Sequence, residues 1–314
     1  MNNKIALTYY DRNEGKLKTE KVYASGFLYW SYNTRTGQWA TDKIVRRKYI
    51  SRLYGWLHKH SWSKWKIKSF VQKADVNLDE LVQPLKDFES FNDFFIREID
   101  LSKRPINPDP NVCIAPVDGK VLVYPKVELD MAFRIKRSTF NLRQFLRNDA
   151  MADQFEGCSM VISRLCLADY HHFHFPDSGI PNRTISIPGN YHAGGPYSLR
   201  NLIPFYAENH RTFTLFDSDH FGQMIISEIG ALTVGSIQQH FQPGLHVERG
   251  DRKGYFELGG STVVLLFQKG MIELDKDICT YTQNDIETYV RFGDSVGRNS
   301  KSTLNEEKQK GGAF

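Results

Sequence analysis

The chain lacks the features that would place it across a membrane or in an oxidising compartment. No apolar run approaches the roughly 18 residues that a spanning helix needs, and the longest is about TVVLLF at 262–267. The amino-terminal stretch has no apolar core of a secretory signal either. The few cysteines form no C-x-x-C pair, which excludes a disulfide framework and a thiolate zinc site. We interpret them as reduced core residues of a cytosolic protein; they are Cys113, Cys158, Cys166 and Cys279.

Acidic residues are missing from one long segment. Residues 43–73, KIVRRKYISRLYGWLHKHSWSKWKIKSFVQK, contain ten Lys or Arg and no Asp or Glu, although the whole chain has a net charge of only +5. The remainder is therefore net negative. Apolar residues within this segment recur at helical spacing, which predicts one amphipathic helix here and a second over 62–74. The apolar positions of the first helix are Val45, Tyr49, Leu53, Trp56 and Leu57.

Helical spacing early in the chain, followed by short strand-like runs separated by Gly, Pro and Asn or Asp, predicts an α+β protein. It would have a helical amino-terminal region and a mainly antiparallel β catalytic domain. We expect a hairpin-like extension at 1–42, a basic helical region at 43–104, a β-rich domain at 105–297 and a disordered tail at 298–314. Ser90 with Asp93 resembles a capping box that starts a short helix, and three phenylalanines fall on one side of it. Prolines then mark a linker. These residues are Phe91, Phe94 and Phe95, followed by Pro105, Pro108 and Pro110.

Three stretches of the β-rich region contain residues with chemical potential. They are APVDGKV with Asp118, DYHHFHFPDSG with His171, His172 and His174, and LGGSTVVLLF with Ser261. A serine becomes a nucleophile when a base takes its proton, and a carboxylate best holds that base. Each residue also has an ordinary structural interpretation: Asp118 starts an Asp-Gly turn, and Ser261 lies in a turn without the G-x-S-x-G pattern.

The histidine cluster allows a competing hypothesis. His172 and His174 would share one face of a strand, as metal ligands often do, so a metal-dependent β-barrel enzyme is an alternative. No further ligand motif completes such a set. His171 and His174 have an odd separation, so a regular strand would point them to opposite faces. If both serve one site, the chain there must bend or bulge.

Five motifs in order resemble those of phosphatidylserine decarboxylase proenzymes: FNDFFIRE, APVDGKV, DYHHFHFPDSG, ALTVGSI and LGGSTVVLLF. The resemblance runs from about 91 to 267. It implies a carboxy-lyase made as a precursor that cuts itself between Gly260 and Ser261. The products would be a β chain of residues 1–260 and an α chain of residues 261–314. A glycine before the cut suits the strained geometry, since it has no Cβ.

The resemblance also implies the role of each site residue. His174 matches the base that deprotonates Ser261, and Asp118 matches the carboxylate that orients this histidine. Ser261 would become a covalent pyruvoyl group, which forms a Schiff base with phosphatidylserine and releases carbon dioxide to give phosphatidylethanolamine. No metal and no pyridoxal phosphate are expected. His171 matches a histidine of the decarboxylation step, Thr262 supports the oxyanion or merely the turn, and we expect His172 to be structural.

A lipid substrate gives the basic segment a role. Basic and aromatic residues on one amphipathic helix suit docking at an anionic membrane, which predicts a peripheral protein on the cytoplasmic side of the cell membrane. One alternative is a basic helix whose apolar face packs on the core. Another is a contact with nucleic acid, but we expect no nucleic-acid partner. A lipid-binding module of the same fold without processing, and a homodimer, also stay open. The docking residues are Arg46, Arg47, Lys48, Trp56, Trp62 and Trp65.

Overall fold

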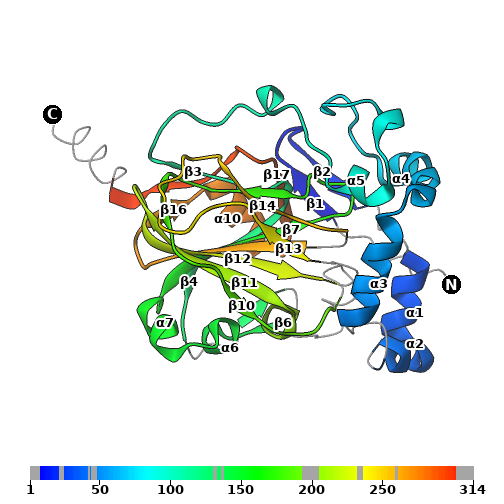
Figure 1. Cartoon of the computed structure of the whole chain (residues 1–314). Coiled ribbons are helices and arrows are strands. Elements are labelled where there is room, and N and C mark those ends of the chain that lie inside the picture. The colour runs from blue at the N-terminus through cyan, green and yellow to red at the C-terminus, as the bar shows by residue number, and fades with distance from the viewer. Residues whose placement is uncertain are drawn as a thin grey trace.

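A ten-stranded sheet forms the centre of the molecule (Figure 1). The computed structural model describes residues 8–20, 25–41, 43, 48–129, 133–135, 138–192, 205–231, 236–258 and 261–301. The strand order is β10-β11-β12-β15-β7-β4-β17-β1-β2, with β9 beside β11. The strands are β1 (Thr8–Asp11), β2 (Lys16–Thr19), β4 (Gly119–Val127), β7 (Cys158–Leu165), β9 (Gly179–Pro181), β10 (Ile185–Ile187), β11 (Arg211–Ser218), β12 (Gly222–Gly230), β15 (Ser261–Phe267) and β17 (Glu287–Val290).

Neighbouring strands of this sheet run antiparallel except at one place. β1 and β17 are parallel, whereas β4, β7, β12 and β15 pair antiparallel with their neighbours. The prediction of a mainly antiparallel domain is confirmed. The central strands are buried along their whole length, because β15 (STVVLLF) and β7 (CSMVISRL) are continuous runs that present apolar side chains to both faces.

Smaller sheets and helices complete the β-rich region. One sheet joins β13 (Ile237–Gln239), β14 (Arg252–Phe256) and β8 (His172–His174). A second joins β16 (Ile272–Leu274), β18 (Ser295–Asn299) and β3 (Val112–Ile114), and a third joins β5 (Phe133–Ile135) with β6 (Ser138–Phe140). The helices are α6 (Leu142–Leu146), α7 (Asp149–Gln154), α9 (Phe205–Glu208) and α10 (Lys276–Gln283), of which α10 packs on β4 and β17.

The remaining helices gather at one end of the molecule (Figure 1). They are α1 (Ser25–Asn33), α2 (Arg35–Ala40), α3 (Lys48–His58), α4 (Lys66–Ala74) and α5 (Phe91–Phe95), with 3₁₀ turns at Ser61–Trp65, Leu85–Asp87 and Leu101–Lys103. The predicted cap is present, since Ser90 Oγ accepts from the Asp93 backbone N–H at 3.1 Å. Phe91, Phe94 and Phe95 are buried together as expected, in a cluster that also contains Leu258. The helical region therefore packs on the chain just before Ser261.

The predicted amino-terminal extension is partly wrong. A hairpin forms as expected from β1 and β2, but it is not a separate appendage. β1 instead pairs with β17 in the main sheet, because the hairpin supplies backbone groups that would otherwise be unpaired at the exposed edge of β17. Residues 25–40 are helical rather than hairpin-like.

The expected start of the tail is also too early. β18 extends to Asn299 and pairs with β3 and β16, so residues 298 and 299 belong to the folded domain. Disorder beyond them stays a prediction, because residues 302–314 lie outside the described residues.

Candidate active site

Ser261 is the first residue of β15, at the centre of the main sheet. Its backbone lies opposite Leu165 at the end of β7 and Gly230 at the end of β12. Its side chain is 1 % exposed, and Oγ has no hydrogen-bond partner among the described residues. A buried hydroxyl without a partner is costly in a folded chain. Ser31, Ser163, Thr262 and Thr288 share this state with Ser261, which differs from them in following two glycines in the sequence. Gly260 lies outside the described residues.

His171 is brought to the same end of these strands by two short connections. Its carbonyl accepts from the backbone N–H of Phe256 at 3.0 Å, five residues before Ser261. On the other side, His171 follows Leu165, the partner of Ser261, by six residues. His171 Nδ1 lies 2.8 Å from the carbonyl of Asp169. A carbonyl only accepts, so Nδ1 carries the proton and the Nε2 lone pair is free, in agreement with its lack of a partner.

The environment of His171 keeps its ring neutral. The ring is buried, and its centroid lies 3.9 Å from that of Phe95 in α5. Burial and, to a smaller extent, the nearby positive charge of Arg97 together lower the pKa of His171 to about 3. At neutral pH this residue therefore offers a lone pair rather than a proton.

His174 is also a neutral base in a defined tautomer. Nδ1 lies 2.8 Å from the carbonyl of Gly250, so Nδ1 carries the proton and Nε2 accepts from the Tyr170 hydroxyl at 3.2 Å. The ring stacks on Phe292 with centroids 4.0 Å apart. Burial lowers the pKa of His174 to about 4. The strand that faces it changes register between Arg252 and Gly254, in line with the irregular backbone expected here.

Asp118 makes no hydrogen bond to His174 in the part of the chain that the structure describes. Asp118 Oδ1 and Oδ2 accept from the guanidinium of Arg104 at 3.1 and 2.9 Å, and Oδ1 also accepts from the Phe292 backbone N–H at 2.7 Å. The carboxyl is buried, which raises its pKa, while Arg104 acts in the opposite direction. The Phe292 ring stacks on the His174 ring, and the Phe292 backbone N–H donates to Asp118. The link between Asp118 and His174 therefore runs through Phe292.

The structure therefore places the predicted residues around one end of the central strands without joining Asp118, His174 and Ser261 in a hydrogen-bonded triad. The pairing of His174 with Gly250 and Tyr170 depends on the tertiary fold, which no sequence motif specifies. The roles of Asp118 and His174 remain predictions.

Thr262 and His172 fit structural interpretations at least as well. Thr262 is fully buried on the opposite face of β15 from Ser261, and its Oγ1 has no partner among the described residues. His172 Nε2 lies 2.8 Å from the carbonyl of Ile96, which ties β8 to the end of α5. Among the described residues no group of three or more His, Cys, Asp or Glu is placed to hold a metal ion.

Two arginines near the site were missed by sequence reasoning. Arg104 follows the predicted helix in a proline-rich stretch, where nothing marks it as the partner of Asp118. Arg97 lies within FNDFFIRE, and its Nη2 donates to the carbonyls of Ala168 and Asp169 at 2.5 and 3.1 Å. Arg97 thereby fastens the turn that leads into His171. The sequence pointed to Arg97 only through its place in the FNDFFIRE motif.

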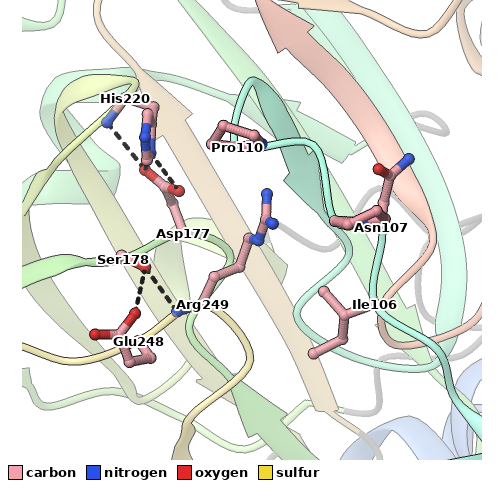
Figure 2. Close-up of a pocket in the computed structure, with 9 residues that line it drawn as sticks. Ile106, Asn107, Pro110, Asp177, Ser178, His220, Glu248 and Arg249 are labelled. Carbon is pink, nitrogen blue, oxygen red and sulfur yellow. Dashed lines mark hydrogen bonds and ion pairs between the residues drawn. The ribbon is translucent and has the colours of Figure 1, made fainter.

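A pocket of about 270 Å³ is lined by Asp177 and Ser178, which lie near the end of the DYHHFHFPDSG motif (Figure 2). Asp177 accepts from His220 Nδ1 at 3.0 Å, and Ser178 Oγ donates to Glu248 and accepts from the Arg249 backbone N–H. None of the predicted catalytic residues lines it. Asp177 and Ser178 therefore organise neighbouring loops rather than the surroundings of Ser261.

The low pKa of His174 gives a pH-dependent prediction. A histidine base works in its neutral form, and burial moves the loss of that form from about 6.5, the value of a free histidine, to about 4. If His174 deprotonates Ser261, the rate of self-cleavage will be constant from pH 8 to about 5 and will fall below that. The measurement is a time course of freshly made precursor on denaturing gels, with circular dichroism to verify folding. A midpoint near 6.5 would contradict the assignment.

The fold and the site are those expected of a self-cleaving enzyme precursor: a buried serine without a partner among the described residues follows two glycines at the start of a central strand, and two buried neutral histidines belong to the segment that follows β7. Comparisons with known proteins agree with this class. A family model described as phosphatidylserine decarboxylase matches residues 91–298. A protein of Clostridium beijerinckii named phosphatidylserine decarboxylase proenzyme is 38% identical over 288 residues, which cover 92% of this chain and 97% of the relative.

Relatives from other bacteria have the same name. The protein of Desulfitobacterium hafniense is 39% identical over 291 residues, covering 93% of this chain and 98% of the relative. That of Chlamydia felis is 37% identical over 292 residues, with the same coverage of both chains. The chain belongs to the phosphatidylserine decarboxylase family.

Proposed function

We propose that this chain is a phosphatidylserine decarboxylase that cuts itself between Gly260 and Ser261 and uses the resulting pyruvoyl group. The observation that carries the proposal is the buried Ser261 hydroxyl, which has no partner among the described residues and lies at the same end of the central strands as His171, whose Nε2 lone pair is free. The names of the relatives and the order of the five motifs support it.

Self-cleavage follows from the position of Ser261. Oγ attacks the carbonyl carbon of Gly260 as a histidine takes its proton, and the peptide C–N bond breaks to leave an ester and a free amine. Removal of the Cα proton of residue 261 then expels the Gly260 carboxylate and leaves dehydroalanine. Tautomerisation and addition of water release ammonia and leave a ketone at the new amino terminus. The central strand β15 holds that terminus in place.

The ketone supplies an electron sink for the bond between Cα and the carboxylate of the serine head group. The neutral histidines supply the proton transfers. His171, with a free Nε2, can take the proton that the substrate ammonium must lose before its nitrogen reacts. The same Nε2 can return a proton to carbon after carbon dioxide leaves. Its low pKa makes the protonated ring a strong acid, which suits the second step.

The test is release of carbon dioxide from phosphatidylserine labelled in the serine carboxyl group. We expect release by the processed wild type, with phosphatidylethanolamine as the second product, and none by Ser261→Ala. Processed wild type that releases no label from any phosphatidylserine tested would contradict the function.

Membrane docking is the second part of the proposal. Three tryptophans that the sequence suggested are exposed in the folded chain: Trp56 by 56%, Trp62 by 51% and Trp65 by 70%. Leu53 and Tyr54 in α3 are exposed too, so the apolar side of this helix does not pack wholly on the core. Exposed tryptophans beside lysines suit the interface of an anionic bilayer. Arg46 and Arg47 lie outside the described residues, as does the side chain of Lys48.

This surface is close to the cleavage segment. Lys59, just after α3, forms an ion pair with Glu257 at 2.6 Å, and Leu258 packs in the cluster of the helical region. A lipid head group arriving at the tryptophans would therefore be near Ser261. No helix among the described residues is long and apolar enough to span a bilayer.

Replacing Trp56, Trp62 and Trp65 together by alanine will weaken binding to vesicles containing phosphatidylserine by at least about 100-fold, since each buries apolar area worth about 1–2 kcal/mol. Cosedimentation measures this. Leu245→Ala is the matched control, because Leu245 is 57% exposed in the β-rich domain. The second set of variants replaces the basic residues by glutamate.

Arg46→Glu, Arg47→Glu and Lys48→Glu together will remove the preference for anionic over neutral vesicles. Unchanged binding by both sets of variants would contradict the docking proposal.

A further inference from the structure

We infer that the amino-terminal hairpin, residues 8–20, is a clamp that retains the small chain after self-cleavage. The inference rests on the proposed function, because it needs the chain to be cut before Ser261. The hairpin would then belong to the large chain, and residues 261–314 to the small one. Nothing in the sequence motifs assigns the hairpin a role.

The backbone of the hairpin joins the two chains directly. β1 pairs in parallel with β17, where Tyr9 faces Glu287 and Asp11 faces Tyr289. The Arg12 backbone N–H continues this ladder by donating to the carbonyl of Tyr289 at 3.3 Å. β17 has only two neighbours in the sheet, β4 and β1. Without the hairpin, β17 would be an edge strand held by β4 alone.

Arg12 is the centre of the side-chain contacts. Its Nη2 donates to Asp275 and Asp277 at 2.8 Å each, and its Nη1 donates to the carbonyl of Ser295 at 2.6 Å. All three partners follow the cleavage site. The Tyr10 ring stacks on Tyr281 in α10, with centroids 4.1 Å apart. One residue at the hairpin turn thus bonds two separate elements of the small chain, the start of α10 and the start of β18.

A buried ion network closes the other end of the hairpin. Arg164 in β7 donates to Glu287 at 2.9 and 2.7 Å and to Glu20 at 3.1 and 2.7 Å. Arg164 and Glu287 are almost fully buried. Glu287 belongs to the small chain, whereas Glu20 and Arg164 belong to the large one. Buried charges of this kind are strongly destabilising when one partner is removed, so the network opposes separation of the chains.

Cleavage changes what these contacts have to do. In the uncut chain, an opened β17 stays tethered and returns at a high effective concentration. After the cut, a small chain that opens fully can diffuse away. The same hairpin contacts therefore determine how often β17 opens reversibly in the precursor. In the mature protein they determine how fast the small chain is lost.

The test compares Arg12→Ala in the cut protein and in the uncut Ser261→Ala background. We expect the small chain to be lost from cut Arg12→Ala at least about tenfold faster than from cut wild type, after dilution in mild urea and size-exclusion chromatography. Loss will be greater at lower protein concentration, which a purely structural role would not produce. In the uncut background, Arg12→Ala will unfold reversibly with no dependence on concentration.

Lys16→Ala is the matched control, because the ion pair of Lys16 is with Glu14 inside the hairpin and does not reach the small chain. We expect wild-type retention from it. Arg12→Lys, which keeps the charge, will retain the small chain better than Arg12→Ala. Equal retention in cut Arg12→Ala and cut wild type would overturn the clamp alone, whereas a wild type that stays uncut would overturn the proposed function and the clamp together.

Discussion

Ser261→Ala will stay a single full-length chain, whereas the wild type will separate into chains of residues 1–260 and 261–314. The change removes the only atom that can attack the preceding carbonyl. It will not unfold the protein, because Ser261 Oγ forms no hydrogen bond with any of the described residues and alanine removes a buried polar atom that has no partner among them. We expect a thermal midpoint equal to or slightly above that of a precursor trapped before the cut. Denaturing gels and thermal unfolding measure both effects.

Ser163→Ala is the matched control for this experiment. Ser163 lies on β7 beside β15, is fully buried, and its Oγ also has no partner among the described residues. Its removal changes the packing in the same way without touching the cleavage site. We expect Ser163→Ala to be cut like the wild type. Cleavage of Ser261→Ala at the wild-type rate would contradict the role of the hydroxyl.

Asp118→Asn will slow self-cleavage by at least about 100-fold. Asp118 accepts two hydrogen bonds from Arg104 and one from the Phe292 backbone N–H. An asparagine has a single oxygen, so its amide group will face either Arg104 Nη2 or both Arg104 Nη1 and the Phe292 backbone N–H. In the second orientation the Phe292 N–H loses its acceptor. The Phe292 ring stacks on the His174 ring, so a shift of the Phe292 backbone will displace the predicted base.

The same substitution will lower stability. Arg104 loses one of its two carboxylate partners, which destabilises the fold because its buried charge is then paired with Glu80 alone. Thermal unfolding in the Ser261→Ala background measures this without interference from the cut. Glu80→Gln is the control: Glu80 is the other carboxylate bonded to Arg104, at 2.7 Å, but it does not contact Phe292. We expect cleavage by Glu80→Gln within a few-fold of wild type, and equal rates for the two variants would contradict the route through Phe292.

Much of the fold could be predicted because local patterns agree with the final structure. The apolar run after Ser261 is a central strand, and Ser90 caps its helix as the spacing suggested. The union of β1 with β17 could not be predicted. Both strands are four residues long, their pairing spans almost the whole chain, and a short alternating pattern does not say which edge it will join.

The candidate site shows the same division. The residue types came from motifs, and the structure places Ser261 and the turn that carries His171 at one end of the central strands. The hydrogen-bond partners did not follow from those motifs, because they are backbone carbonyls and a distant arginine. Asp118 pairs with Arg104, whose position in a proline-rich stretch has no local signal. Protonation states likewise depend on burial, which a motif does not specify.

Decarboxylation depends on the conversion of Ser261 to a pyruvoyl group, and the intact mass of the small chain tests that conversion most directly. Wild-type protein is purified, denatured and measured by mass spectrometry, with hydrazine labelling to reveal a ketone. We predict a chain of 54 residues starting at position 261, lighter than the unmodified peptide by one ammonia and reactive toward hydrazine. A small chain that begins with an ordinary serine, or only the intact chain of 314 residues, would contradict it.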